Sequence, residues 1–146
     1  MLKGIDPVIH ADLMHAMMRM GHGDDLVLCD INHPAATIAA HTTYGRLLDL
    51  SGCGLTEAAR AILTLFPLDT FVERPVSRMQ VVGDPEARMP IFDAMQDVVD
   101  ASQGRAIPME ALERFAFYEA AKRSFVIVRT SDPGPYGCFI FKKGVI

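Results

Sequence analysis

The residue best suited to move a proton in this chain is His22, which stands between two glycines. Gly21 and Gly23 let the backbone turn sharply and let a ligand come close to the imidazole. A histidine side chain titrates at about pH 6.5, so it can both donate and accept a proton near neutral pH. A surface histidine after the end of a helix gives the same pattern. His22 is therefore a candidate acid–base group.

Four further residues carry groups able to bind a polar ligand. Asp30 follows the apolar run 26–29, and open α/β sheets bind ligands beyond the carboxyl ends of their strands. An aspartate that only forms a turn would look the same. Arg114 and Tyr118 share one face of a helix, either as ligand contacts or as an ordinary surface pair. Tyr136 follows a Pro-Gly-Pro turn and either presents its phenol to a ligand or completes the turn.

All five histidines lie within the first 41 residues, a clustering that raises the question of a metal site. No pair of them shows HxH or HExxH spacing, and no cysteine stands at ligand spacing. We therefore expect no metal and no cofactor. The three cysteines are widely spaced and form no CxxC motif, which indicates reduced thiols and a cytoplasmic protein.

Helical and strand-like patterns alternate along the chain without a repeat or a linker. We therefore expect residues 1–146 to form a single α/β domain with a mixed β-sheet flanked by helices. The turn-rich stretch 131–135 separates the last two strands and predicts that they pair as a hairpin. The expected helices cover residues 12–20, 55–66, 91–99 and 113–123, and the expected strands cover residues 26–29, 47–50, 79–82, 125–128 and 139–141.

The composition is apolar for so small a protein, with 50% hydrophobic and 22% charged residues. It requires either a large core or surface buried between subunits, and we favour a homo-oligomer. The net charge of −4 comes without a basic stripe, which argues against a nucleic-acid partner. No apolar run reaches the roughly 18 residues of a membrane span, and the N-terminus lacks the apolar segment of a secretory signal, so we expect no membrane association.

Five short motifs occur in order along the whole chain. They are MLKGI at 1–5, MGHGD at 20–24, RFAFYE at 114–119, YG at 136–137 and KKGV at 142–145. As a set they resemble the fucose mutarotase/ribose pyranase family from end to end. RFAFYE is similar to the fucose branch. The ribose branch usually places a histidine in this region, and this chain has none after residue 41.

The resemblance implies an isomerase that interconverts the α and β anomers of a free monosaccharide, above all L-fucose, without a cofactor. It also implies rings of five subunits or stacked decamers, with sites between neighbouring subunits. His22 is then the catalytic acid–base group. Two alternatives stay open: a D-ribose pyranase, which uses the same proton transfers, and a sugar-binding accessory protein without turnover. The residues implied to contact the sugar are Asp30, Arg114, Tyr118, Tyr136 and Cys138.

Three positions depart from the family pattern. Cys138 stands where the family usually has asparagine, which removes an amide able to bind a sugar hydroxyl. His33 replaces a common phenylalanine, and Ala120 replaces an arginine. These changes leave the reaction class intact but leave open which sugar is bound. Cys138 also keeps the non-catalytic alternative open.

Overall fold

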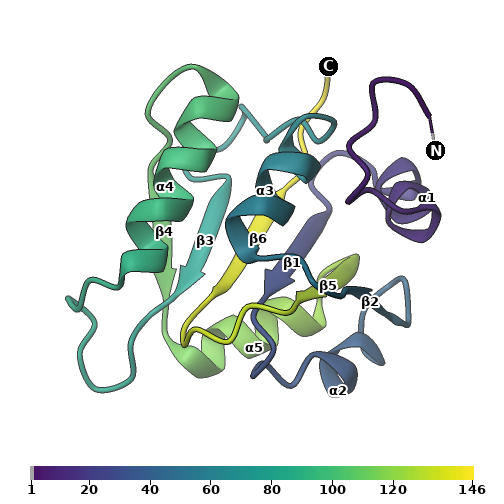
Figure 1. The fold of residues 1–146 in the computed structure, drawn as a ribbon. Helices are drawn as coiled ribbons and strands as arrows, with labels where there is room; N and C mark the ends of the chain where they lie inside the picture. Colours follow the sequence, from purple (N-terminus) through teal and green to yellow (C-terminus); the bar gives the residue numbers. More distant parts are fainter. Residues whose placement is uncertain (1) are drawn as a thin grey trace.

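The computed structural model describes residues 2–146, which form a mixed six-stranded sheet with helices on both faces (Figure 1). The strands are β1 (Asp25–Cys29), β2 (Leu47–Leu50), β3 (Val76–Met79), β4 (Met109–Leu112), β5 (Val126–Thr130) and β6 (Cys138–Lys142). Their order across the sheet is β2-β5-β1-β6-β3-β4, and β6 runs opposite to the other five. The expected α/β domain with a mixed sheet is confirmed.

Two layers of helices cover the sheet (Figure 1). Side chains alternate along a strand, so Leu26 and Leu28 of β1 point to one face while Val27 and Cys29 point to the other. Because both faces are covered, the central strands are apolar over most of their length, with polar residues only at their ends. The first face packs on α1 (Ala11–Arg19), α3 (Leu55–Leu63) and α4 (Pro90–Gln103), and the second packs on α2 (Ala35–Ala39) and α5 (Arg114–Lys122).

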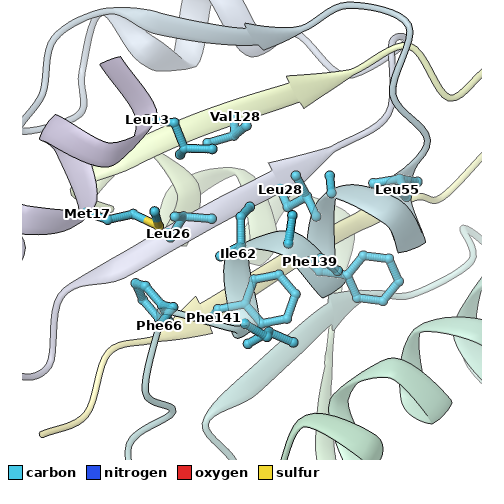
Figure 2. Packing of buried hydrophobic residues seen from close by; sticks show 14 of the residues in the cluster. Leu13, Met17, Leu26, Leu28, Leu55, Ile62, Phe66, Val128, Phe139 and Phe141 are labelled. Carbon is cyan, nitrogen blue, oxygen red and sulfur yellow. The ribbon is translucent and has the colours of Figure 1, made fainter. Parts of the chain in front are cut away.

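The larger core lies between α3 and the middle of the sheet. Leu55 and Ile62 are seven residues apart, two turns of helix, so both point from α3 into this core (Figure 2). Phe139 and Phe141 of β6 belong to the same cluster, and all four side chains are fully buried. α3 ends at Leu63, three residues earlier than expected, although the chain beyond it still packs on this core.

The expected hairpin is wrong. β1 lies between β5 and β6, parallel to the former and antiparallel to the latter. The segment between β5 and β6 makes its hydrogen bonds to the end of β1 instead of closing a tight turn. The Asp30 N–H donates to the carbonyl of Gly137 (2.8 Å), and the Ile31 N–H donates to that of Asp132 (3.0 Å).

Three further elements differ from expectation. β3 spans Val76–Met79 and shares only its last residue with the expected strand 79–82. β4 is an edge strand whose residues are only partly buried or exposed, so it lacks an apolar run. α2 has five residues, too few for a helical period to show in the sequence. Nowhere in residues 2–146 is there a helix with both the length and the apolar character needed to cross a membrane.

Candidate active site

A pocket of about 310 Å³ opens at the edge of the sheet where the parallel strands end. β1, β3 and β4 reach this edge with their carboxyl ends, and β6 begins there. Open α/β sheets bind ligands at such an edge. The pocket brings together the five expected sugar contacts, Asp30, Arg114, Tyr118, Tyr136 and Cys138, and adds Asn32 and His33.

Asp30 is buried at the end of β1, and backbone groups hold both of its carboxylate oxygens. Oδ1 accepts hydrogen bonds from the N–H groups of Asn32 (2.8 Å) and His33 (3.1 Å), and Oδ2 accepts one from Gly137 (2.9 Å). Burial raises the pKa of Asp30, while these hydrogen bonds act in the opposite direction. The turn role of Asp30 is thus observed, and the same carboxylate also lines the pocket.

Cys138 and His33 contact each other beside Asp30. The Cys138 sulfur lies 3.6 Å from Asp30 Oδ2 and 3.4 Å from His33 Nδ1. Burial raises the pKa of the Cys138 thiol well above its usual value and lowers the pKa of His33 to about 4. Both side chains are therefore neutral near pH 7.

Arg114 and Tyr118 enter the pocket from the first two turns of α5. The Glu113 carboxylate caps this helix by accepting hydrogen bonds from the N–H groups of Phe115 (2.7 Å) and Ala116 (3.3 Å). The guanidinium of Arg114 lies over the Phe115 ring, 4.6 Å from its centroid. Its buried Nε has no hydrogen-bond partner within residues 2–146, and the side chain lines the pocket.

Tyr136 has a φ of 61°, which is uncommon for a residue with a large side chain. Its hydroxyl accepts a hydrogen bond from the Val82 N–H (3.2 Å), which leaves the hydroxyl proton to donate. A Cβ added at the next residue, Gly137, would overlap the Leu55 side chain and lie 3.3 Å from the Cβ of Asp30. Any larger residue at this position would require the Leu55 side chain to move and would crowd Asp30.

His22 does not line this pocket. It precedes β1 whereas Asp30 follows it, and the five residues of that strand span about 16 Å at about 3.3 Å per residue. Within one chain, His22 and the expected sugar contacts therefore lie at opposite edges of the sheet.

His22 has a cluster of its own at the amino end of β1. Its Nε2 lies 3.2 Å from Asp69 Oδ1, and its ring packs edge-on against Phe71 with centroids 5.1 Å apart. The Phe71 N–H also donates to Asp69 Oδ1 (2.9 Å). This hydrogen bond and, to a smaller extent, the contact with His22 lower the pKa of Asp69 below its usual value. A buried carboxylate thus orients an imidazole whose side chain is still 42% exposed.

Two sequence motifs fold together to support this cluster. The Lys143 Nζ donates to the carbonyls of Met17 (2.9 Å) and Met20 (2.6 Å) at the end of α1. The Gly23 N–H donates to the carbonyl of Lys143 (2.8 Å). KKGV therefore holds the MGHGD loop in place, although more than a hundred residues separate the two motifs in the sequence.

Larger hollows lie elsewhere, one of about 640 Å³ between α3 and α4, one of about 550 Å³ along residues 2–15 and one of about 380 Å³ beside residues 49–53. The smaller pocket is distinguished by its chemistry, since it combines a buried carboxylate, two tyrosines and two buried nitrogens without partners. In the described part of the chain, residues 2–146, no three His, Cys, Asp or Glu side chains are arranged to hold a metal ion.

The sequence pattern of the RbsD / FucU transport protein family matches residues 3–146. The chain belongs to this family. The resemblance drawn from the five motifs is confirmed.

Relatives in the RbsD/FucU family match the full length of the chain. Human fucose mutarotase is 36% identical over 148 residues, which cover 99% of this chain and 94% of that protein. The structure of the Streptococcus pneumoniae fucose mutarotase in complex with L-fucose matches with a TM-score of 0.88 and 33% identity, covering 99% of each chain. The crystal structure of a putative sugar binding protein matches with a TM-score of 0.96 and 44% identity, covering 100% of this chain and 97% of that one.

Asp69 is a residue of this RbsD/FucU protein that the sequence analysis missed, since no motif marks it and only the fold brings it to His22. His33 was noted as a departure from the family pattern. Its contact with Cys138, the other departure, appears only in the structure.

Proposed function

We propose that this protein is a mutarotase that interconverts the α and β anomers of a free monosaccharide and prefers L-fucose. The observation that carries the proposal is the pocket beyond β1, which is lined by a buried carboxylate, an arginine with an unpartnered nitrogen and two tyrosines. The full-length relatives named fucose mutarotase support the same reaction.

Mutarotation needs only proton transfers. A base takes the proton from the C1 hydroxyl and an acid protonates the ring oxygen, so the C1–O bond of the ring breaks and an aldehyde forms. Rotation about the C1–C2 bond and the reverse transfers close the ring on the other face of C1. We assign these proton transfers to His22 as the acid–base group. Asp30 accepts hydrogen bonds from sugar hydroxyls. Positioned acid–base catalysis of this kind contributes roughly 10²–10⁴-fold.

His22 reaches the pocket from a neighbouring subunit. The two sets of groups lie about 16 Å apart at opposite edges of one sheet, so a contact between these edges in different chains brings them together. Large apolar side chains are exposed at both edges and suit such a contact. They are Phe71 and Val72 near His22, and Ile31, Val82 and Phe115 near the pocket.

Such a contact joins two different surfaces. Each subunit therefore contacts one neighbour through the His22 edge of its sheet and a second neighbour through the pocket edge. Repeated head to tail, this arrangement closes into a ring. We propose a pentameric ring or a decamer of two stacked rings, as in the family that the motifs resemble. The protein acts in the cytoplasm, where its three buried free thiols stay reduced.

Arg114 favours L-fucose over D-ribose. A guanidinium donates several hydrogen bonds in a fixed plane and therefore selects one arrangement of neighbouring hydroxyls. NMR exchange spectroscopy on L-fucose, D-ribose and D-galactose at equal enzyme concentration tests this directly. We expect the fastest exchange with L-fucose. Faster exchange of ribose would identify a pyranase, and binding without exchange of any sugar would identify an accessory protein.

Mixed rings test whether neighbours share a site. His22→Ala and Asp30→Asn subunits are each expected to be inactive when pure. After the two are dissociated, mixed equally and reassembled, about one quarter of the sites combine an intact His22 with an intact Asp30 from the neighbour. Recovery of about that share of wild-type exchange supports the shared site. No recovery in reassembled rings contradicts it.

A further inference from the structure

His33 is a buried polar side chain in the pocket wall that the proposed proton transfer does not use. Only 6% of the residue is exposed. Its ring stands edge-on to Phe117 and Tyr118, with centroids 5.8 Å and 5.3 Å away, so its orientation is fixed by packing. Nε2 has no hydrogen-bond partner within residues 2–146. Buried polar atoms nearly always have a partner, so a group outside the described chain, either a ligand or a water molecule, is expected at this nitrogen.

The contacts of Nδ1, the other nitrogen of the His33 ring, determine whether Nε2 carries a proton. The Cys138 thiol has one proton and faces two acceptors, Asp30 Oδ2 and His33 Nδ1. A carboxylate accepts more strongly than a neutral imidazole, so the thiol proton goes to Asp30. The sulfur then accepts from Nδ1–H, and Nε2 carries no proton. The chain of hydrogen bonds from Asp30 through Cys138 to His33 thus leaves Nε2 as an acceptor without a partner within residues 2–146, on a side chain that lines the pocket.

We propose that His33 adds to the sugar specificity of this pocket, with Nε2 accepting a hydrogen bond from one ring hydroxyl of the monosaccharide and Cys138 positioning the imidazole. This inference rests on the proposed function, because it concerns the same pocket. It also explains why the departures at positions 33 and 138 are in contact. The amide expected at position 138 is absent, and the group that binds a hydroxyl stands on the neighbouring wall instead.

Single-deoxy analogues of L-fucose, lacking the hydroxyl at C2, C3 or C4, test the proposal in the full assembly. Dissociation constants come from NMR titration, and kcat and KM come from anomer exchange. We expect wild-type protein to bind the analogue that lacks the His33-bound hydroxyl roughly fivefold more weakly than L-fucose because of this one net hydrogen bond, beside any losses at hydroxyls bound by other residues. His33→Phe should abolish this difference for that analogue alone and raise KM for L-fucose while changing kcat little.

Two further variants separate hydrogen bonding from packing. His33→Gln keeps a polar atom near the position of Nε2 and should retain the discrimination. Cys138→Ala removes the acceptor of Nδ1–H and should weaken it. The proposal is overturned if wild-type protein binds every analogue as well as L-fucose, or if His33→Phe keeps the wild-type ratios. Absence of anomer exchange by wild-type protein would refute the mutarotase proposal instead, while the binding ratios would still test His33. Absence of any sugar binding would refute both.

Discussion

The burial of His33 makes the stability of the fold depend on pH. Burial lowers the pKa of His33 to about 4, whereas in the unfolded chain it returns to about 6.5. As the pH falls, the unfolded state therefore binds this proton first. The contribution of neutral His33 to the free energy of unfolding is complete above about pH 6.5 and is lost between about pH 6.5 and pH 4.

The size of this loss follows from the two pKa values. Their difference of about 2.5 corresponds to about 3 kcal/mol over the whole range. Between pH 7 and pH 5 the unfolded histidine becomes almost fully protonated, while the folded one is protonated in only about a tenth of the molecules. About 2 kcal/mol of stability is therefore lost between these two pH values because of His33 alone.

Urea-induced unfolding at pH 7 and pH 5, at one protomer concentration and without sugar, measures the effect. Wild-type protein should lose about 2 kcal/mol more than His33→Phe between the two pH values. His33→Gln, which cannot be protonated, should behave like His33→Phe. His41→Gln replaces an exposed histidine and should behave like wild type. An equal loss in wild type and His33→Phe would refute the reasoning.

Three other predictions concern the two edges of the sheet. His22→Gln should slow anomer exchange in NMR by roughly 10²–10⁴-fold while the dissociation constant of L-fucose stays within about twofold, and exchange at the wild-type rate would remove His22 from the mechanism. Asp69→Asn should lower kcat more than it changes KM, because it disturbs the orientation of His22; an effect confined to KM would contradict that role. Gly137→Ala should lower the free energy of unfolding in urea by about 1–3 kcal/mol, since its Cβ would overlap the Leu55 side chain; unchanged stability would mean that the core yields there.

The sequence predicted the elements whose signals are local. β1 and β5 are covered on both faces and therefore appear as continuous apolar runs, and the period of Leu55 and Ile62 marks α3. The hairpin prediction was wrong because strand order depends on contacts between distant segments. The loop before β6 is held by the end of β1, with Gly137 beside Asp30, and no local pattern encodes that contact.

The roles of the expected site residues stay predictions, but the structure shows why these residues lie together. Three of the five expected sugar contacts stand beside the ends of β1 and β6, and the other two reach the same edge of the sheet from the first two turns of α5. The sequence analysis did not predict that His22 lies at the other edge, although a strand separates it from Asp30 in the sequence. The contact of Asp69 with His22 and the burial of His33 arise only from tertiary packing.

β1 carries His22 before its first residue and Asp30 after its last, and this has a genetic consequence for the proposed ring. A subunit whose β1 is disturbed inactivates two sites. One is its own pocket, and the other is the neighbouring pocket to which it contributes His22. When half of the subunits in a cell carry such a change and mix freely, only about one quarter of the sites are built from two unchanged subunits. If each subunit formed its site alone, about half of the sites would stay intact. Alleles that disturb β1 without preventing assembly should therefore be partly dominant, whereas alleles that prevent assembly should be recessive.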